Sequence, residues 1–325
     1  IKEWLYQILS KDQVVVKNPG SYNSQVGVPL SVWQLQPYHQ LGIFEAGISR
    51  PGEMEKLESV IQPTVGIFTN IGSSHSEGFT SQEEKIREKL KLFKDVEILV
   101  YRKDHNPLDK IISQSNVKTF SWGTNPLATV NVDFKGDICF IVYKNEKHEL
   151  RLPFSDKASQ ENCLHCVALM LTMGYDIPVI QEKITVLRSI PMRMELKEGI
   201  NQCQLIDDSY NNDLGGLALA LQFLTNQRQK EKKRLILSDI LESGLGHEEL
   251  VRQIASLIFQ NNVQRFVGIG PVLSDYRFLF PETASFYLST KDFLDRFNFS
   301  DITQWGGGAM RVNIVYLVGS NFCFQ

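Results

Sequence analysis

Short apolar runs alternate with amphipathic helical segments over the first 190 residues of the chain. Five of these runs have the length of strands, at residues 12–16, 41–45, 65–69, 98–101 and 119–121. Strands that alternate with helices are typical of parallel βαβ units. The pattern therefore predicts an α/β fold with a doubly wound, mostly parallel sheet.

Residues 128–152 depart from this alternation. Their apolar positions are separated by the polar breaks 135–137 and 144–146, which are typical of turns between short strands. We expect a small antiparallel meander here, folded over one edge of the sheet. A predicted helix at about 160–173 then closes the domain.

A second series of strands and helices begins near Gln204, with later strands at 235–238 and 266–270. The length of 325 residues fits two domains, since a domain usually has about 100 to 200 residues. We predict a first domain at 1–190 and a smaller Rossmann-like α/β domain at 191–325, joined by a linker at 188–199.

Composition narrows the class of protein. Hydrophobic residues make up 42% and charged residues 22%, as in ordinary globular enzymes. The net charge of -3 provides no broad basic surface for nucleic acid, and no apolar run approaches the roughly 18 residues that would argue for membrane insertion. The five cysteines are scattered and odd in number, which indicates reduced thiols and a cytoplasmic protein. Cys163 and Cys166 fall on the apolar face of a predicted helix, so we expect them to pack in the core.

A carboxylate and an imidazole follow two of the predicted strands. Glu45 ends one strand, and His75 follows the next one after the polar residues Thr69 and Asn70. Ligands of open α/β sheets bind at the carboxyl ends of strands, so we expect both side chains at a common edge of neighbouring strands. They could hold Mg²⁺ if ATP phosphates complete its oxygen shell. Taken singly, each residue could instead be structural.

Several segments, in this order, are similar to the Mur ligases and together cover nearly the whole chain. They are 18–29, 44–47, 69–72 with His75, 191–195, 206–212, and 239–244 with His247.

This resemblance implies an ATP-dependent amide-bond ligase of peptidoglycan precursor synthesis, and hence of cell-wall biogenesis, cell shape and cell division. The chain most resembles the members that add D-alanyl-D-alanine to a UDP-muramoyl tripeptide through an acyl phosphate. Residues 1–190 would then be a truncated central ATP-binding domain, and 191–325 the C-terminal domain. The implied cofactors are ATP and Mg²⁺.

The resemblance also places a carbamylated lysine at Lys89, which would join Glu45 and His75 as a magnesium ligand and catalytic group. Carbamylation requires a neutral amine, and an ordinary lysine with a pKa of about 10.4 is rarely neutral at pH 7. Burial or a nearby cation must therefore lower its pKa. Lys85, Lys91 and Lys94 compete for this role. All four lysines lie on or next to a predicted helix at 82–93, where a lysine could also be an ordinary solvated charge.

Further site residues follow from the same resemblance. Asn162 would face adenine, although an asparagine near a helix start could also be a cap. Arg193 would reach ATP from the hinge. The remaining expected nucleotide-binding residues are Asp208, Tyr210 and Asn211, and the expected substrate-binding residues are Ser21, Asn23 and Ser24.

The ends of the chain depart from the family pattern. Ile1 opens directly into a helix without an N-cap residue, and the phosphate loop of the family would precede it. Val318 replaces a family lysine. We expect a fragment that lacks the phosphate loop and is nearly inactive alone. A folylpolyglutamate synthase-like ligase, a non-catalytic precursor-binding fragment, and part of a fusion with an alanine racemase remain alternatives.

Overall fold

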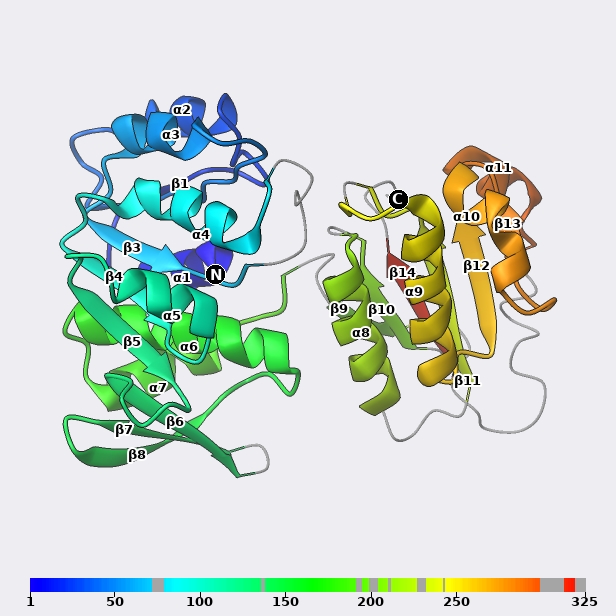
Figure 1. Ribbon diagram of the computed structural model, residues 1–325. Helices are drawn as coiled ribbons and strands as arrows, with labels where there is room; N and C mark the ends of the chain where they lie inside the picture. Colours follow the sequence, from blue (N-terminus) through cyan, green and yellow to red (C-terminus); the bar gives the residue numbers. More distant parts are fainter. Residues whose placement is uncertain are drawn as a thin grey trace. The chain divides into compact units, whose positions relative to one another are not determined.

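The computed structural model describes residues 1–71, 79–135, 138–190, 195–198, 204–209, 212–226, 232–241, 243–298 and 313–318. They form two compact units, one within residues 1–188 and one from residue 189 onward (Figure 1). Each unit combines helices with a mostly parallel sheet, which confirms the predicted α/β class.

The main sheet of the first unit has the strand order β3-β4-β5-β6-β7-β8. Its strands are β3 (Val65–Phe68), β4 (Ile98–Arg102), β5 (Thr119–Gly123), β6 (Val130–Lys135), β7 (Ile138–Tyr143) and β8 (Glu146–Arg151). Strands β3 to β6 pair in parallel, and β6 to β8 pair antiparallel. The predicted meander is present, but the expectation that it folds over the edge is wrong. It extends the sheet instead, because β6 pairs with β5.

Strands β1 (Val15–Lys17) and β2 (Leu41–Ile43) pair with each other in parallel as a separate two-stranded sheet. Among the described residues, β2 is bonded to β1 and β3 to β4. The prediction that Glu45 and His75 follow neighbouring strands is therefore wrong. An apolar run indicates a strand, but the partner of so short a strand depends on its tertiary surroundings.

Helices cover both faces of the main sheet (Figure 1). The helices of this unit are α1 (Lys2–Leu9), α2 (Gly27–Val32), α3 (Glu53–Ile61), α4 (Gln82–Leu90), α5 (Asn106–Ile112), α6 (Lys157–Thr172) and α7 (Ile177–Thr185). Apolar side chains of α3, α4 and α5 pack with those of β3 and β4, whereas α6 contacts β4 and β5. Every residue of α6 from Cys163 to Leu171 is buried, which confirms core positions for Cys163 and Cys166.

The sheet of the second unit has the order β13-β12-β11-β14-β10-β9. Its strands are β9 (Glu195–Glu198), β10 (Gln204–Asp208), β11 (Lys232–Ser238), β12 (Arg265–Ile269), β13 (Ser285–Tyr287) and β14 (Asn313–Val318). The edge strand β9 is antiparallel to β10, and the other pairs are parallel. Strand β14, the last of the described strands, lies in the middle of the sheet between β10 and β11.

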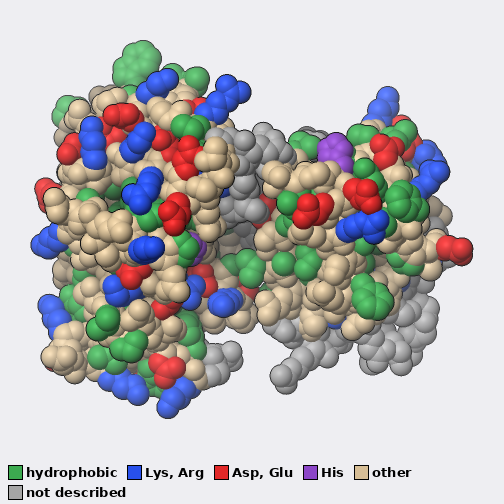
Figure 2. Space-filling view, in the orientation of Figure 1, with side chains coloured by type: hydrophobic (Ala, Val, Ile, Leu, Met, Phe, Trp, Pro, Cys, Tyr) green, Lys and Arg blue, Asp and Glu red, His purple; other side chains and the backbone are tan. Residues whose placement is uncertain are grey.

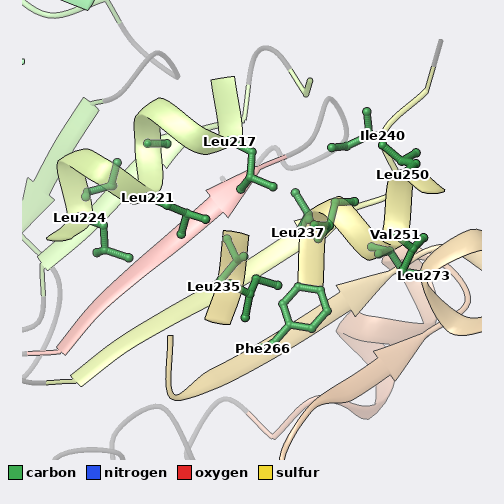
Figure 3. Packing of buried hydrophobic residues seen from close by; sticks show 14 residues of the cluster. Leu217, Leu221, Leu224, Leu235, Leu237, Ile240, Leu250, Val251, Phe266 and Leu273 are labelled. Carbon is green, nitrogen blue, oxygen red and sulfur yellow. The ribbon is translucent and has the colours of Figure 1, made fainter. Parts of the chain in front are cut away.

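The helices of the second unit are α8 (Leu214–Asn226), α9 (His247–Gln260), α10 (Pro271–Asp275) and α11 (Thr290–Arg296). Leucines of α8 and β11, residues of α9 and Phe266 of β12 belong to one buried cluster, in which Phe266 lies beside Leu235 (Figure 3). The ring of Phe266 stacks on Phe280 at 4.7 Å between centroids and meets Phe286 at 5.8 Å. This core holds the helices against the sheet.

No helix in the described part of the chain is long and apolar enough to cross a membrane. On the face shown in Figure 2, basic and acidic side chains are interspersed over both units. This face therefore shows no broad basic patch, in agreement with the expectation from the net charge.

Phe266 is 2% exposed, so Phe266→Ala removes a buried ring and leaves a cavity. We expect a loss of about 3 to 5 kcal/mol in the free energy of unfolding of the second unit, measured by urea denaturation. Phe259 is a matched control, since its side chain on α9 is 84% exposed. Phe259→Ala should change stability by less than about 0.5 kcal/mol. Equal losses in the two variants would show that this core is described wrongly.

Candidate active site

The backbone of Glu45 is held by the side chain of Asn18. The Asn18 amide donates to the Glu45 carbonyl at 2.9 Å, and the Glu45 N–H donates to Asn18 Oδ1 at 3.0 Å. Asn18 lies just after β1 and is fully buried, and Glu45 lies just after β2. The two bonds continue the pairing of β1 and β2 and fix the place where Glu45 leaves the sheet.

The Glu45 carboxylate has polar neighbours and remains open to solvent. Asn23 donates to Oε1 at 3.2 Å, Lys2 Nζ lies 4.0 Å from Oε2, and the Glu45 side chain is 41% exposed. An accessible carboxylate of this kind can accept a cation.

Lys2 is a site residue that the sequence reading missed. It is buried, and it donates to the carbonyl of Asn18 at 2.9 Å and to that of Gly20 at 2.6 Å. Its burial could have been predicted from the helical spacing, because Lys2 shares a face of α1 with the buried Leu5 and Leu9. A lysine on an apolar face needs polar partners, and here it holds the loop after β1.

The three predicted substrate residues lie in this loop. The side chain of Asn23 contacts Glu45, as described above, and the hydroxyl of Ser24 accepts a hydrogen bond from Gly27 N–H at 3.2 Å. The carbonyl of Ser21 accepts from Asn23 N–H at 2.6 Å. Substrate binding by these residues stays a prediction, and the structure adds that Asn23 lies beside Glu45.

Lys89, in the last turn of α4, has an unusual environment. Burial of the amine lowers its pKa, the positive charge of Lys85 lowers it further, and the negative charge of Glu45 opposes both, leaving the pKa at about 8. Glu45 and Lys89 are thus close enough to interact electrostatically although 44 residues separate them in the sequence. A lowered pKa is what carbamylation requires.

Two of the lysines that compete with Lys89 for carbamylation are exposed and paired with carboxylates. Lys91 pairs with Glu88 at 2.8 Å and Lys94 pairs with Glu58 at 2.8 Å, and the two side chains are 44% and 50% exposed. Hydrogen bonds to these carboxylates raise the pKa of both lysines. Their amines therefore stay charged at pH 7. Lys85 is buried and Lys89 is half-buried, so the structure narrows the choice to these two.

Helix α4 is fixed by Glu88, the neighbour of Lys89. The Glu88 carboxylate is almost completely buried and accepts hydrogen bonds from Gly52 N–H at 2.7 Å and from Met54 N–H at 3.3 Å. These donors lie at the N-terminus of α3, where a carboxylate is favourable. The carboxyl end of α4 is thereby held against α3.

Asn162 lies inside α6, beyond its first turn. The cap of α6 is Asp156, whose side chain accepts from Ser159 N–H at 2.7 Å. The alternative that Asn162 is a helix cap is therefore wrong. Contact with adenine stays a prediction.

The described part of the predicted 206–212 loop is anchored at strand ends. Asp208 ends β10, and the preceding Asp207 accepts from Lys197 at 2.7 Å and from the Ser209 hydroxyl at 2.6 Å. Asn212 donates to the carbonyl and the hydroxyl of Ser238, at 3.0 Å each, and so ties the loop to the end of β11. The predicted residues His75, Arg193, Tyr210 and Asn211 lie outside the described residues.

Magnesium fits the donors that the structure brings together. The described residues contain no group of three or more His, Cys, Asp and Glu side chains that could hold a metal. Glu45 offers an open carboxylate, and Lys89 could add carbamate oxygens because burial lowers its pKa. Oxygen donors are those that Mg²⁺ prefers, and it commonly retains waters and nucleotide phosphates as its other ligands.

Comparison with known proteins now decides the family. Residues 1–170 match the model described as the Mur ligase middle domain. The chain belongs to the Mur ligase family. A UDP-N-acetylmuramoyl-tripeptide–D-alanyl-D-alanine ligase of Borreliella burgdorferi is 28% identical over 288 residues, which cover 85% of this chain and 61% of the relative. This Mur ligase chain thus spans about three fifths of that relative's length.

Solved structures of Mur ligases share the fold. MurF from Acinetobacter baumannii has a TM-score of 0.79 at 19% identity and covers 99% of this chain and 71% of its own. MurF ligase from Thermotoga maritima, in complex with ADP, has a TM-score of 0.79 at 19% identity and covers 98% of this chain and 73% of its own. The predicted fold is thereby confirmed.

Carbamylation of Lys89 can be tested directly. The neutral amine adds to CO₂, a C–N bond forms and a proton leaves, giving a carbamate. With a pKa of about 8, about a tenth of the Lys89 amine is neutral at pH 7. At fixed dissolved CO₂, carbamate should therefore increase as the pH is raised through 8. Nuclear magnetic resonance with ¹³C-labelled bicarbonate should show the carbamate carbon.

Lys89→Ala should remove that carbamate signal, whereas Lys91→Ala should retain it. Lys85→Ala serves as the second comparison, since Lys85 is a buried lysine of the same helix. Loss of the signal in the Lys85 variant, with retention in Lys89→Ala, would show that the assignment to Lys89 is wrong.

Proposed function

We propose that this Mur ligase adds D-alanyl-D-alanine to a UDP-muramoyl tripeptide in an ATP-dependent reaction of peptidoglycan precursor synthesis. The observation that carries the proposal is the partly buried Lys89 amine, whose pKa is lowered and which the negative charge of Glu45 reaches. The name of the Borreliella burgdorferi relative supports the choice of substrates. Cytoplasmic location, ATP and Mg²⁺ belong to the same proposal.

The proposed reaction activates the tripeptide carboxylate by transfer of the γ-phosphoryl group of ATP. The free amine of D-alanyl-D-alanine then attacks the acyl phosphate, an amide bond forms and phosphate leaves. When bound, Mg²⁺ neutralises charge on the phosphate oxygens. Positioning and electrostatic stabilisation dominate such a transfer.

The described residues divide these tasks. Glu45 supplies a fixed carboxylate, because Asn18 holds its backbone and Asn23 holds one of its oxygens. Lys89, once carbamylated, supplies a second anionic group from the end of α4. The loop of Asn23 would hold the muramoyl substrate next to Glu45. Asn162 would contact the base of the nucleotide.

The test uses the full-length protein expressed from its coding sequence. We expect phosphate release that requires ATP, UDP-muramoyl tripeptide and D-alanyl-D-alanine together. Glu45→Gln keeps the shape of the side chain and removes its charge, so kcat should fall about a hundredfold. Glu55→Gln is a control, because Glu55 is exposed on α3.

Two results would contradict the proposal. Turnover with pteroyl substrates in place of the muramoyl peptide would favour a folylpolyglutamate synthase. Binding of the muramoyl peptide without any phosphate release would favour a non-catalytic precursor-binding protein.

A further inference from the structure

A second polar cluster joins strand ends of the first unit to α6. It consists of Asn70, Arg102, Asp104 and Glu161, and we call it the Arg102 cluster. Arg102 donates from Nε to Asp104 at 3.0 Å and from Nη1 to Glu161, and Asn70 donates to the second Glu161 oxygen at 3.1 Å. The side chains of Arg102, Asp104 and Glu161 are only 23%, 18% and 16% exposed. The three charged side chains are partly buried and Asn70 is exposed, and together they connect the ends of β3 and β4 to α6.

The position of Asp104 is built into the backbone around it. Its carboxylate accepts from Thr124 N–H at 3.0 Å and from Asn125 N–H at 2.8 Å. Gly123 has a φ of +153°, and a Cβ at this position would lie 2.7 Å from Asp104 Oδ2. Burial acts to raise the pKa of Asp104, but the hydrogen bonds from Thr124 and Arg102 outweigh it and hold the pKa below its usual value. Asp104 is thus an ionised anchor for Arg102.

Helix α6 is fixed to the sheet at two points one turn apart. Glu161 binds Arg102, and His165 accepts a hydrogen bond from Trp122 of β5 at 3.1 Å. The Arg102 guanidinium also lies over the Trp122 ring, 5.5 Å from its centroid. Burial lowers the pKa of His165 to about 3, so its ring is neutral and can accept this bond near neutral pH. Asn162 lies between the two anchors.

We propose that the ion pair of Arg102 and Glu161 is a positioning pair, which holds Asn162 for the base of a bound nucleotide. This inference rests on the proposed function. The cluster lies at the carboxyl ends of β3 and β4, where ligands of α/β sheets bind.

Stability alone gives little reason for such a pair, because burying two charges costs about as much free energy as their attraction returns. A firmly held Asn162 discriminates between bases better than a mobile one, because its hydrogen bonds to the base edge then keep one geometry. The pair would therefore contribute to base selectivity as well as to position.

The test measures the binding of three ligands to the full-length protein by calorimetry: ATP, GTP and inorganic tripolyphosphate. Glu161→Gln keeps the side-chain shape and removes the charge. Loss of one charge-assisted hydrogen bond should raise the Kd for ATP about tenfold. The Kd for tripolyphosphate, which has no base, should stay within about twofold, and the preference for ATP over GTP should decrease.

Arg102→Lys provides a second variant that retains the cation but cannot bind both carboxylates with one planar group. It should weaken ATP binding in the same selective way. Glu248→Gln is the matched control, since Glu248 pairs with Arg252 at 2.6 Å on an exposed helix face of the second unit. It should leave all three affinities unchanged.

The results separate this inference from the proposed function. Unchanged ATP affinity in both cluster variants would overturn the inference alone. An equal loss of ATP and tripolyphosphate affinity would also overturn it, because the pair would then act only on the overall structure. Absence of ATP binding by the unmodified protein would contradict the proposed function itself.

Discussion

The pairing of the Asn18 side chain with both backbone groups of Glu45 is the interaction on which the candidate site depends. Asn18 is fully buried, and its loss would remove two hydrogen bonds from the backbone of Glu45. The same amide donates to Tyr22, and the Asn18 carbonyl accepts from Lys2. One asparagine thus connects the end of β2, the loop of Asn23 and the start of α1.

The sequence predicted those parts of the fold that local patterns determine. The apolar runs at 65–69, 98–101 and 119–121 became β3, β4 and β5, because a buried parallel strand needs a continuous apolar segment. The helix at 82–93 is present as α4 and a following turn of 3-10 helix. Within the candidate site, Glu45 and Lys89 could be predicted from motifs, and the negative charge of Glu45 acts on the pKa of the Lys89 amine.

Other parts depend on contacts that no local pattern contains. The pairing of β2 with β1 is set by tertiary packing, and β9 was read as a linker because its charged residues give no apolar signal. The same limit applies to the Arg102 cluster. Arg102 and Glu161 are 59 residues apart, and each alone resembles a surface charge. Only the fold shows that they form a partly buried pair.

The central place of β14 has a consequence for synthesis of the protein. During translation β10 and β11 leave the ribosome long before β14, yet each needs β14 as its neighbour. Until residue 318 has emerged, both strands present open edges that can pair with other chains. The first unit can fold while translation continues, whereas the sheet of the second unit cannot be completed before β14 has been synthesised. Nascent chains that stall shortly before β14 should therefore depend most on chaperones.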